Sequence, residues 1–221
     1  MCLQPMEGIM KHWSNLSLNE REDGTLKLTK DRSIGETILA AKFFTKRVLN
    51  TEVVILTFNP LWHSKNGFEV RTGGNHILLF VFDNKEEVEK ILSLQPWSFD
   101  KHLVILCHYD SATPISELNF NKVPMWLQVH DIPLTFFNKG VAEELYTAMG
   151  EVCKDKKLSK MDGGHYFRVK VTMDVTIHLC RGRKISLENG ATSWVNFKYE
   201  RLPILCYWCD CLDHVDKDCD R

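Results

Sequence analysis

GFEVRTGGNHILLFVFDNKEEVEKILSL, residues 67–94, is the stretch that decides the fold. GFEVRT, residues 67–72, and the apolar run HILLFVF, residues 76–82, flank a pair of glycines, which predicts two strands joined by a turn at the glycines. Asn84 then begins a helix, because asparagine is a favoured N-cap residue and an apolar stripe follows at helical spacing. The stretch therefore predicts strand, strand and helix in that order.

The segments on either side complete a larger unit. Residues 35–45 and 102–109 each favour a strand. Residues 51–62 are ambiguous, because their β-branched residues favour a strand whereas their largest side chains share a helical stripe; we expect a helix. That stripe consists of Val54, Phe58, Leu61 and Trp62. The resulting order, strand-helix-strand-strand-helix-strand, predicts a ferredoxin-like split β-α-β unit of the kind many RNA-binding modules use.

The strand at 76–82 is apolar on both faces. Alternation places Phe80 and Phe82 on one face and three aliphatic residues on the other. Two apolar faces predict a sheet that is covered on one side by its own helices and on the other by a second domain or a partner chain. An open aromatic platform for stacking bases is therefore not expected on this sheet.

A second α+β unit follows and ends in a hairpin. Strands are expected at 125–132 and 166–175, with a helix at 141–149 between them. The dipeptide Asn189-Gly190 separates the strands 183–188 and 192–200 and predicts a tight reversal. The predicted division of the chain is a polar segment at 1–32, the first unit at 33–110, a linker at 111–122, the second unit at 123–202 and a C-terminal module at 203–221.

Alternation along these strands places polar and aromatic side chains opposite the apolar face. Trp194 and Lys198 should point outward from the hairpin, and Arg168 with Lys170 outward from the strand at 166–175. If they share one face, that face mixes positive charge with an aromatic ring, as binding of single-stranded nucleic acid requires. The alternative is an ordinary solvated sheet face with one exposed tryptophan.

CYWCDCLDHVDKDC, residues 206–219, has the spacing of a metal-binding knuckle, C-x2-C-x4-H-x4-C. The predicted ligands are Cys206, Cys209, His214 and Cys219. Three thiolates and one imidazole suit zinc, and closed coordination predicts one structural ion. Cys211 is an alternative to Cys209, although the two-residue interval after Cys206 makes the usual metal-binding turn.

Composition limits the remaining function classes. The chain has 28 Lys and Arg against 29 Asp and Glu, so no overall basic field attracts nucleic acid. No apolar run has the length of a signal peptide or a membrane span, which predicts a soluble intracellular protein of the nucleus or cytoplasm, with no membrane association. The scattered cysteines are expected to be small buried hydrophobes rather than disulfides: Cys2, Cys107, Cys153 and Cys180. We find no enzymatic motif and expect no enzyme.

Several segments resemble a plant family in which a domain of unknown function precedes a CCHC-type zinc knuckle. They are WSNLSLNERED (13–23), LQPWSFDKHLVIL (94–106), PMWLQVHDIPLTFFN (124–138), RVKVTMDVTIHLCRGRKI (168–185) and YERLPILCYWC (199–209). Members of that family are typically encoded by, or derived from, non-LTR retrotransposons, where the region is similar to a Gag-like protein. The resemblance implies zinc binding and nucleic-acid binding.

The knuckle departs from the family pattern Cys-x2-Cys-Gly-x2-Gly-His-x4-Cys. Asp210 and Asp213 replace the two glycines, and residues 201–221 carry three basic against five acidic side chains. Attraction to phosphate should therefore be weak at this module. Tyr207 and Trp208, between the first two ligands, are candidates for stacking on an unpaired base or for packing on the adjacent sheet. The sequence thus predicts a non-enzymatic protein that binds single-stranded nucleic acid weakly; the alternative is a protein-interaction or self-association module with a structural knuckle.

Overall fold

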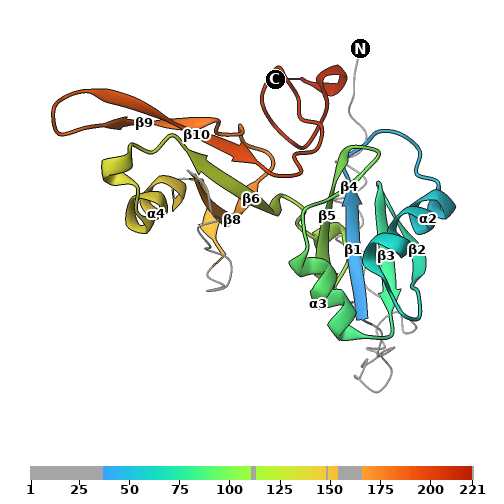
Figure 1. Ribbon diagram of the computed structural model, residues 1–221. Coiled ribbons are helices and arrows are strands. Elements are labelled where there is room, and N and C mark those ends of the chain that lie inside the picture. Colours follow the sequence, from blue (N-terminus) through green and yellow to red (C-terminus); the bar gives the residue numbers. More distant parts are fainter. Residues whose placement is uncertain (1–36, 111–112, 148, 154–165, 221) are drawn as a thin grey trace, which may run out of the picture. The chain divides into compact units, whose positions relative to one another are not determined.

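The computed structural model describes residues 37–110, 113–147, 149–153 and 166–220 (Figure 1). The described residues belong to one compact unit and have an α+β fold with two antiparallel five-stranded sheets and three α-helices. The predicted polar segment at 1–32, and Cys2 within it, lie outside the described residues.

The first sheet has the predicted ferredoxin-like arrangement. Its elements are β1 (Thr37–Phe43), α2 (Thr51–Trp62), β2 (Glu69–Gly74), β3 (Ile77–Phe82), α3 (Lys85–Ser93), β4 (Trp97–Phe99) and β5 (His102–Tyr109). The strand order is β2-β3-β1-β5-β4, and every neighbouring pair is antiparallel. The split β-α-β prediction is confirmed, with the short strand β4 added at the edge beside β5.

The ambiguous segment forms the helix α2, as expected. The Asn50 side chain caps it by accepting hydrogen bonds from the backbone N–H groups of the first turn. Val54, Phe58 and Trp62 are buried at i, i+4 spacing, whereas Leu61 is 48% exposed. The buried stripe is narrower than predicted, because it follows the i+4 line and leaves Leu61 at its edge.

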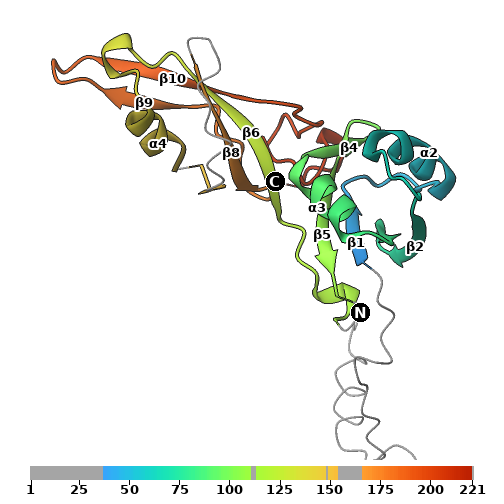
Figure 2. The same ribbon diagram turned by 60° about the horizontal axis from the view of Figure 1, so that its bottom comes forward.

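Both faces of the first sheet are covered. Helices α2 and α3 lie on the same face (Figures 1 and 2), where they pack against Phe80 and Phe82. The other face presents buried aliphatic side chains such as Leu79 and Val81, which belong to the hydrophobic cluster that also contains the inner face of the second sheet. The first sheet therefore offers no open platform for stacking bases, as the sequence predicted.

The second sheet carries the predicted hairpin. Its elements are β6 (Lys122–His130), α4 (Lys139–Thr147), β7 (Glu151–Val152), β8 (Tyr166–Asp174), β9 (Gly182–Ser186) and β10 (Thr192–Tyr199), in the strand order β7-β8-β6-β10-β9. Helix α4 packs its buried residues against the β7 and β8 side. At the tip of the hairpin Gly190 has a φ of 78°, which suits glycine in a tight reversal.

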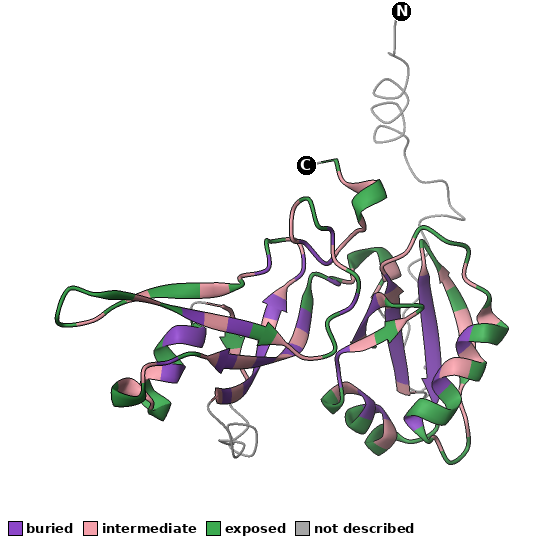
Figure 3. Cartoon of the chain, turned by 45° about the horizontal axis from the view of Figure 1, so that its top comes forward, coloured by how far each residue is buried: buried purple, intermediate pink, exposed green. Residues whose placement is uncertain are grey.

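Burial along the second sheet separates its two faces (Figure 3). Val195 and Phe197 of β10 are buried with the core residues of β6 and β8, whereas Trp194 and Lys198 are exposed. The predicted alternation of the hairpin is thus confirmed. No helix among the described residues has the length and apolarity needed to cross a membrane.

Candidate metal centre and nucleic-acid surface

The C-terminal module gathers four metal-ligating side chains. They are Cys206, Cys209, His214 and Cys219, and their ligand atoms all lie within 4.8 Å of one another. Within this group Cys209 Sγ lies 3.2 Å from His214 Nε2. Three sulfurs and one imidazole nitrogen at this separation fit a tetrahedral zinc ion. The structure therefore brings together the four residues that the sequence spacing predicted.

Backbone hydrogen bonds shape the turn that carries the first two ligands. The Asp210 N–H donates to the Cys206 carbonyl at 2.8 Å, and the Cys206 N–H donates to the Cys211 carbonyl at 2.9 Å. Asp210 has a φ of 54°, in the left-handed region that favours glycine and that aspartate tolerates better than most residues. The missing glycine at this position is thus replaced at a modest cost in backbone energy.

The knuckle is anchored to the loop that follows β8. The Leu179 N–H donates to the Asp210 carbonyl at 2.8 Å, and the Leu212 N–H donates to the Val175 carbonyl at 3.2 Å. The buried Cys211 lies beside the same loop, with its Sγ 3.6 Å from the Thr176 carbonyl oxygen. Cys211 therefore contributes to the anchor, and Cys209, not Cys211, lies in the ligand group.

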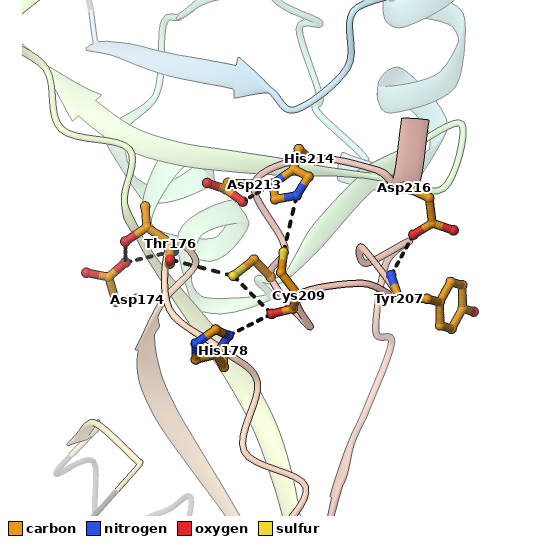
Figure 4. A network of polar contacts seen from close by, with 9 residues as sticks. Asp174, Thr176, His178, Tyr207, Cys209, Asp213, His214 and Asp216 are labelled. Carbon is orange, nitrogen blue, oxygen red and sulfur yellow. Dashed lines mark hydrogen bonds and ion pairs between the residues drawn. The ribbon is translucent and has the colours of Figure 1, made fainter. Parts of the chain in front are cut away.

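Asp213 supports the histidine ligand. Its Oδ1 lies 2.6 Å from His214 Nδ1, while Nε2 of the same ring faces Cys209 (Figure 4). A carboxylate that accepts the Nδ1–H of a ligating histidine fixes the tautomer that leaves Nε2 for the metal, and it makes that nitrogen a better donor. Asp213 thus has a role that the glycine of the family pattern lacks. The φ angle of Asp213 is not positive, so its backbone conformation does not require glycine.

Asp213→Ala should weaken zinc binding by about 10- to 100-fold, the usual cost of losing such a supporting contact. Asp213→Asn should fall between the parent and alanine, because its amide oxygen still accepts the hydrogen bond without the charge. Zinc affinity is measured by competition with a chromophoric chelator. Asp220→Ala removes an exposed acidic charge from the same module and serves as the control; equal affinities for the Asp213→Ala and Asp220→Ala variants would refute the supporting role.

The two aromatic residues of the knuckle point into solvent. Tyr207 is 78% exposed and Trp208 is 80% exposed, so neither packs on the sheet. The Tyr207 N–H donates to Asp216 Oδ1 at 2.6 Å, which fixes the backbone beneath the ring (Figure 4). Two rings are therefore presented on a short turn between the first two metal ligands.

Basic side chains from outside the module partly offset its acidity. Lys46 Nζ lies 2.9 Å from Asp218, and Arg181 lies 3.9 Å from Asp210. Both basic side chains are largely exposed, so each pair contributes little free energy of stabilisation. These pairs reduce the repulsion between the knuckle and a phosphate without making the module basic.

The four other predicted nucleic-acid residues share one face of the second sheet. Strand register places Arg168 opposite Gln128, and Gln128 opposite Lys198. Trp194 lies on the same face, four residues before Lys198 on β10. The sequence predicted a surface that mixes positive charge with an aromatic ring if these side chains share one face. The strand register shows that they do.

Two of those cations are engaged within the protein. Arg168 forms two hydrogen bonds to the Glu200 carboxylate, at 2.7 and 2.8 Å, and its guanidinium lies 3.7 Å from the centre of the Trp126 ring. Lys170 is only 5% exposed, and its Nζ donates to the Ser93 carbonyl at 2.6 Å. Burial lowers the pKa of Lys170. The expectation that Lys170 is solvent-facing is wrong, because this part of the sheet face is covered.

The scattered cysteines that the structure describes are unpaired and partly exposed. Cys107, Cys153 and Cys180 are half-buried and form no disulfide, so they are less enclosed than predicted. Burial raises the pKa of Cys107 to about 11, which keeps its thiol protonated at neutral pH.

The Cys3His group of the C-terminal module has the composition and spacing of a CCHC-type zinc knuckle. Family models agree: residues 173–221 match the zinc knuckle, and residues 36–116 match the domain of unknown function DUF4283. The chain thus carries a DUF4283 domain followed by a zinc knuckle, the arrangement that the sequence segments indicated. No curated protein and no solved structure gives a significant match.

Proposed function

We propose that the protein binds single-stranded RNA or DNA weakly, through a knuckle that holds one structural zinc ion, and that it has no enzymatic activity. The observation that carries the proposal is the pair of exposed rings, Tyr207 and Trp208, between two metal ligands. Each ring has a face free for an unpaired base, and stacking on such a ring contributes about 1–3 kcal/mol. The arrangement of the two family modules supports descent from a Gag-like protein of a non-LTR retroelement.

The structural role of the zinc follows from its ligand set. Four protein ligands close a tetrahedral site and leave no position for a reacting water. Residues 201–220 contain one 3-10 turn and no strand or α-helix, so ligation supplies most of the free energy that orders this segment. Zinc acts here by fixing the turn on which the two rings are mounted.

Weak affinity follows from the charge of the knuckle. Five aspartates surround the ligands, so little counterion is released when a phosphate approaches the module. Stacking is then the main attraction at this site, with base identity of little importance because every base has a π-face.

Tyr207→Ala combined with Trp208→Ala should weaken binding of single-stranded oligonucleotides by roughly 10-fold or more, because both stacking faces are lost. The salt dependence of the remaining binding should keep its slope, since no cation is removed. Fluorescence anisotropy with labelled RNA and DNA oligonucleotides at several salt concentrations measures both quantities.

Tyr207→Phe combined with Trp208→Phe keeps two rings and serves as the matched control, with affinity close to that of the parent. Zinc content must be equal in all three proteins. If the alanine variant binds as tightly as the parent, stacking has no role, and the alternative of a protein-interaction module gains support. Protein partners that co-purify after nuclease treatment would then identify that alternative.

A further inference from the structure

The exposed ring of Trp194, on β10, is held in a fixed orientation. Its Nε1–H donates to Asn196 Oδ1 at 2.9 Å, and the Asn196 amide in turn donates to Asp131 Oδ2 at 2.6 Å. Trp194 is nevertheless 51% exposed. A polar chain of two hydrogen bonds thus orients an aromatic side chain that contributes little to the core.

The ring of Trp194 packs against the backbone of Gly182 in β9. A Cβ at that position would lie 2.6 Å from Cε2 and Nε1 of Trp194, so the indole rests directly on the glycine backbone. One side of the ring is therefore packed, and the exposed half remains available. Because Nε1–H is already donated to Asn196, the ring offers its π-face rather than a hydrogen bond.

Two lysines lie on the same face of the hairpin as the ring, beside the Asp131 carboxylate that holds Asn196. Lys184 is the cross-strand neighbour of Trp194, and Lys198 follows on the same face of β10. Both lysines are exposed, and neither forms an ion pair with any residue that the structure describes. The hairpin at 182–199 carries three basic side chains and one acidic side chain, in contrast to the acidic knuckle.

We infer that Trp194, with Lys184 and Lys198, is a second binding site for single-stranded nucleic acid. A base stacks on the exposed face of the indole, and the two lysines contact the neighbouring phosphates. A fixed ring loses little conformational freedom on binding, and stacking without a hydrogen bond tolerates any base. The inference rests on the proposed function, and it supplies the positive charge that the knuckle lacks.

Trp194→Ala should weaken binding of a 20-nucleotide single strand by about 5- to 150-fold, the range that corresponds to one stacked base. Lys184→Gln combined with Lys198→Gln should instead lower the slope of log affinity against log salt by about 1.4, since each phosphate contact on a single strand contributes about 0.7. Zinc content should be unchanged in both variants. Ultraviolet crosslinking to an oligouridine, followed by mass spectrometry, should place an adduct on Trp194.

Trp194→Phe keeps a ring and should retain most of the affinity. Leu134→Ala removes another exposed side chain of the same unit, 80% exposed, and should have no effect. If Trp194→Ala binds as the parent does while the Tyr207 and Trp208 alanine variant loses binding, the hairpin site is refuted and the proposed function stands. If the parent itself binds no single-stranded nucleic acid, both are refuted.

Discussion

The His214→Ala variant should emerge from native mass spectrometry without zinc, whereas the parent carries one ion. His214 supplies the only nitrogen of the ligand group, and its Nε2 lies 3.2 Å from Cys209 Sγ. Structural zinc contributes on the order of 10 kcal/mol to the folding of small knuckles, so a three-ligand remnant without core of its own should not retain the metal through desalting. The loss is therefore expected to be complete rather than partial.

Two cysteine variants serve as controls for this result. Cys211→Ala changes a buried thiol in the same module that lies outside the ligand group, and Cys107→Ser changes a thiol of the first sheet. Both should retain one zinc ion. If Cys211→Ala releases the metal, or if His214→Ala keeps it, the assignment of the four ligands is wrong.

Most of the fold could be predicted because its signals are local. The Asn84 cap and the Asn189-Gly190 reversal each act within a few residues and give the expected helix start and turn. The turn expected at the glycine pair after residue 72 falls instead at Asn75 and His76, because both glycines belong to β2, where the strand register shifts. The order of strands and helices then leaves few alternatives to the split β-α-β arrangement. The short strand β4 was missed, since three residues give no measurable period.

The metal ligands were predictable for the same reason, since all four lie within fourteen residues. The burial of Lys170 was not, because it depends on the approach of Ser93, 77 positions earlier in the chain. Alternation along one strand shows on which face a side chain lies, but not whether another segment covers that face. The contact between Asp213 and His214 did have a signal in the sequence, because an acidic residue directly precedes the histidine ligand. Comparison with the family pattern identified Asp213 only as a replacement for glycine.

The ordered metal module is larger than the spacing of its ligands indicates. The backbone pairs that join Leu179 to Asp210 and Leu212 to Val175 tie the knuckle to the loop after β8. The family model for the zinc knuckle begins at residue 173, close to that loop. Zinc should therefore order the loop at 175–179 together with the knuckle, because both hydrogen bonds depend on the position of residues 210–212.

Removal of zinc by a chelator should release the backbone amides of Leu179 and Leu212 to hydrogen exchange together with those of the knuckle. Both donate to carbonyls across the junction between loop and knuckle, and these bonds break when residues 210–212 lose their fixed conformation. The amides of β8 (Tyr166–Asp174) should keep their protection, because that strand pairs with β6 along its whole length and needs no metal.

Hydrogen exchange resolved by peptide, with and without chelator, measures this boundary. An increase confined to residues 203–220 would show that the loop at 175–179 is ordered by the sheet alone. An increase that includes β8 and β6 would instead show that the knuckle stabilises the second sheet, so that metal loss unfolds the surface bearing Trp194 as well. Either result in which β8 stays protected leaves the hairpin site intact when the knuckle is lost, and it therefore allows the two proposed contacts with nucleic acid to be measured separately.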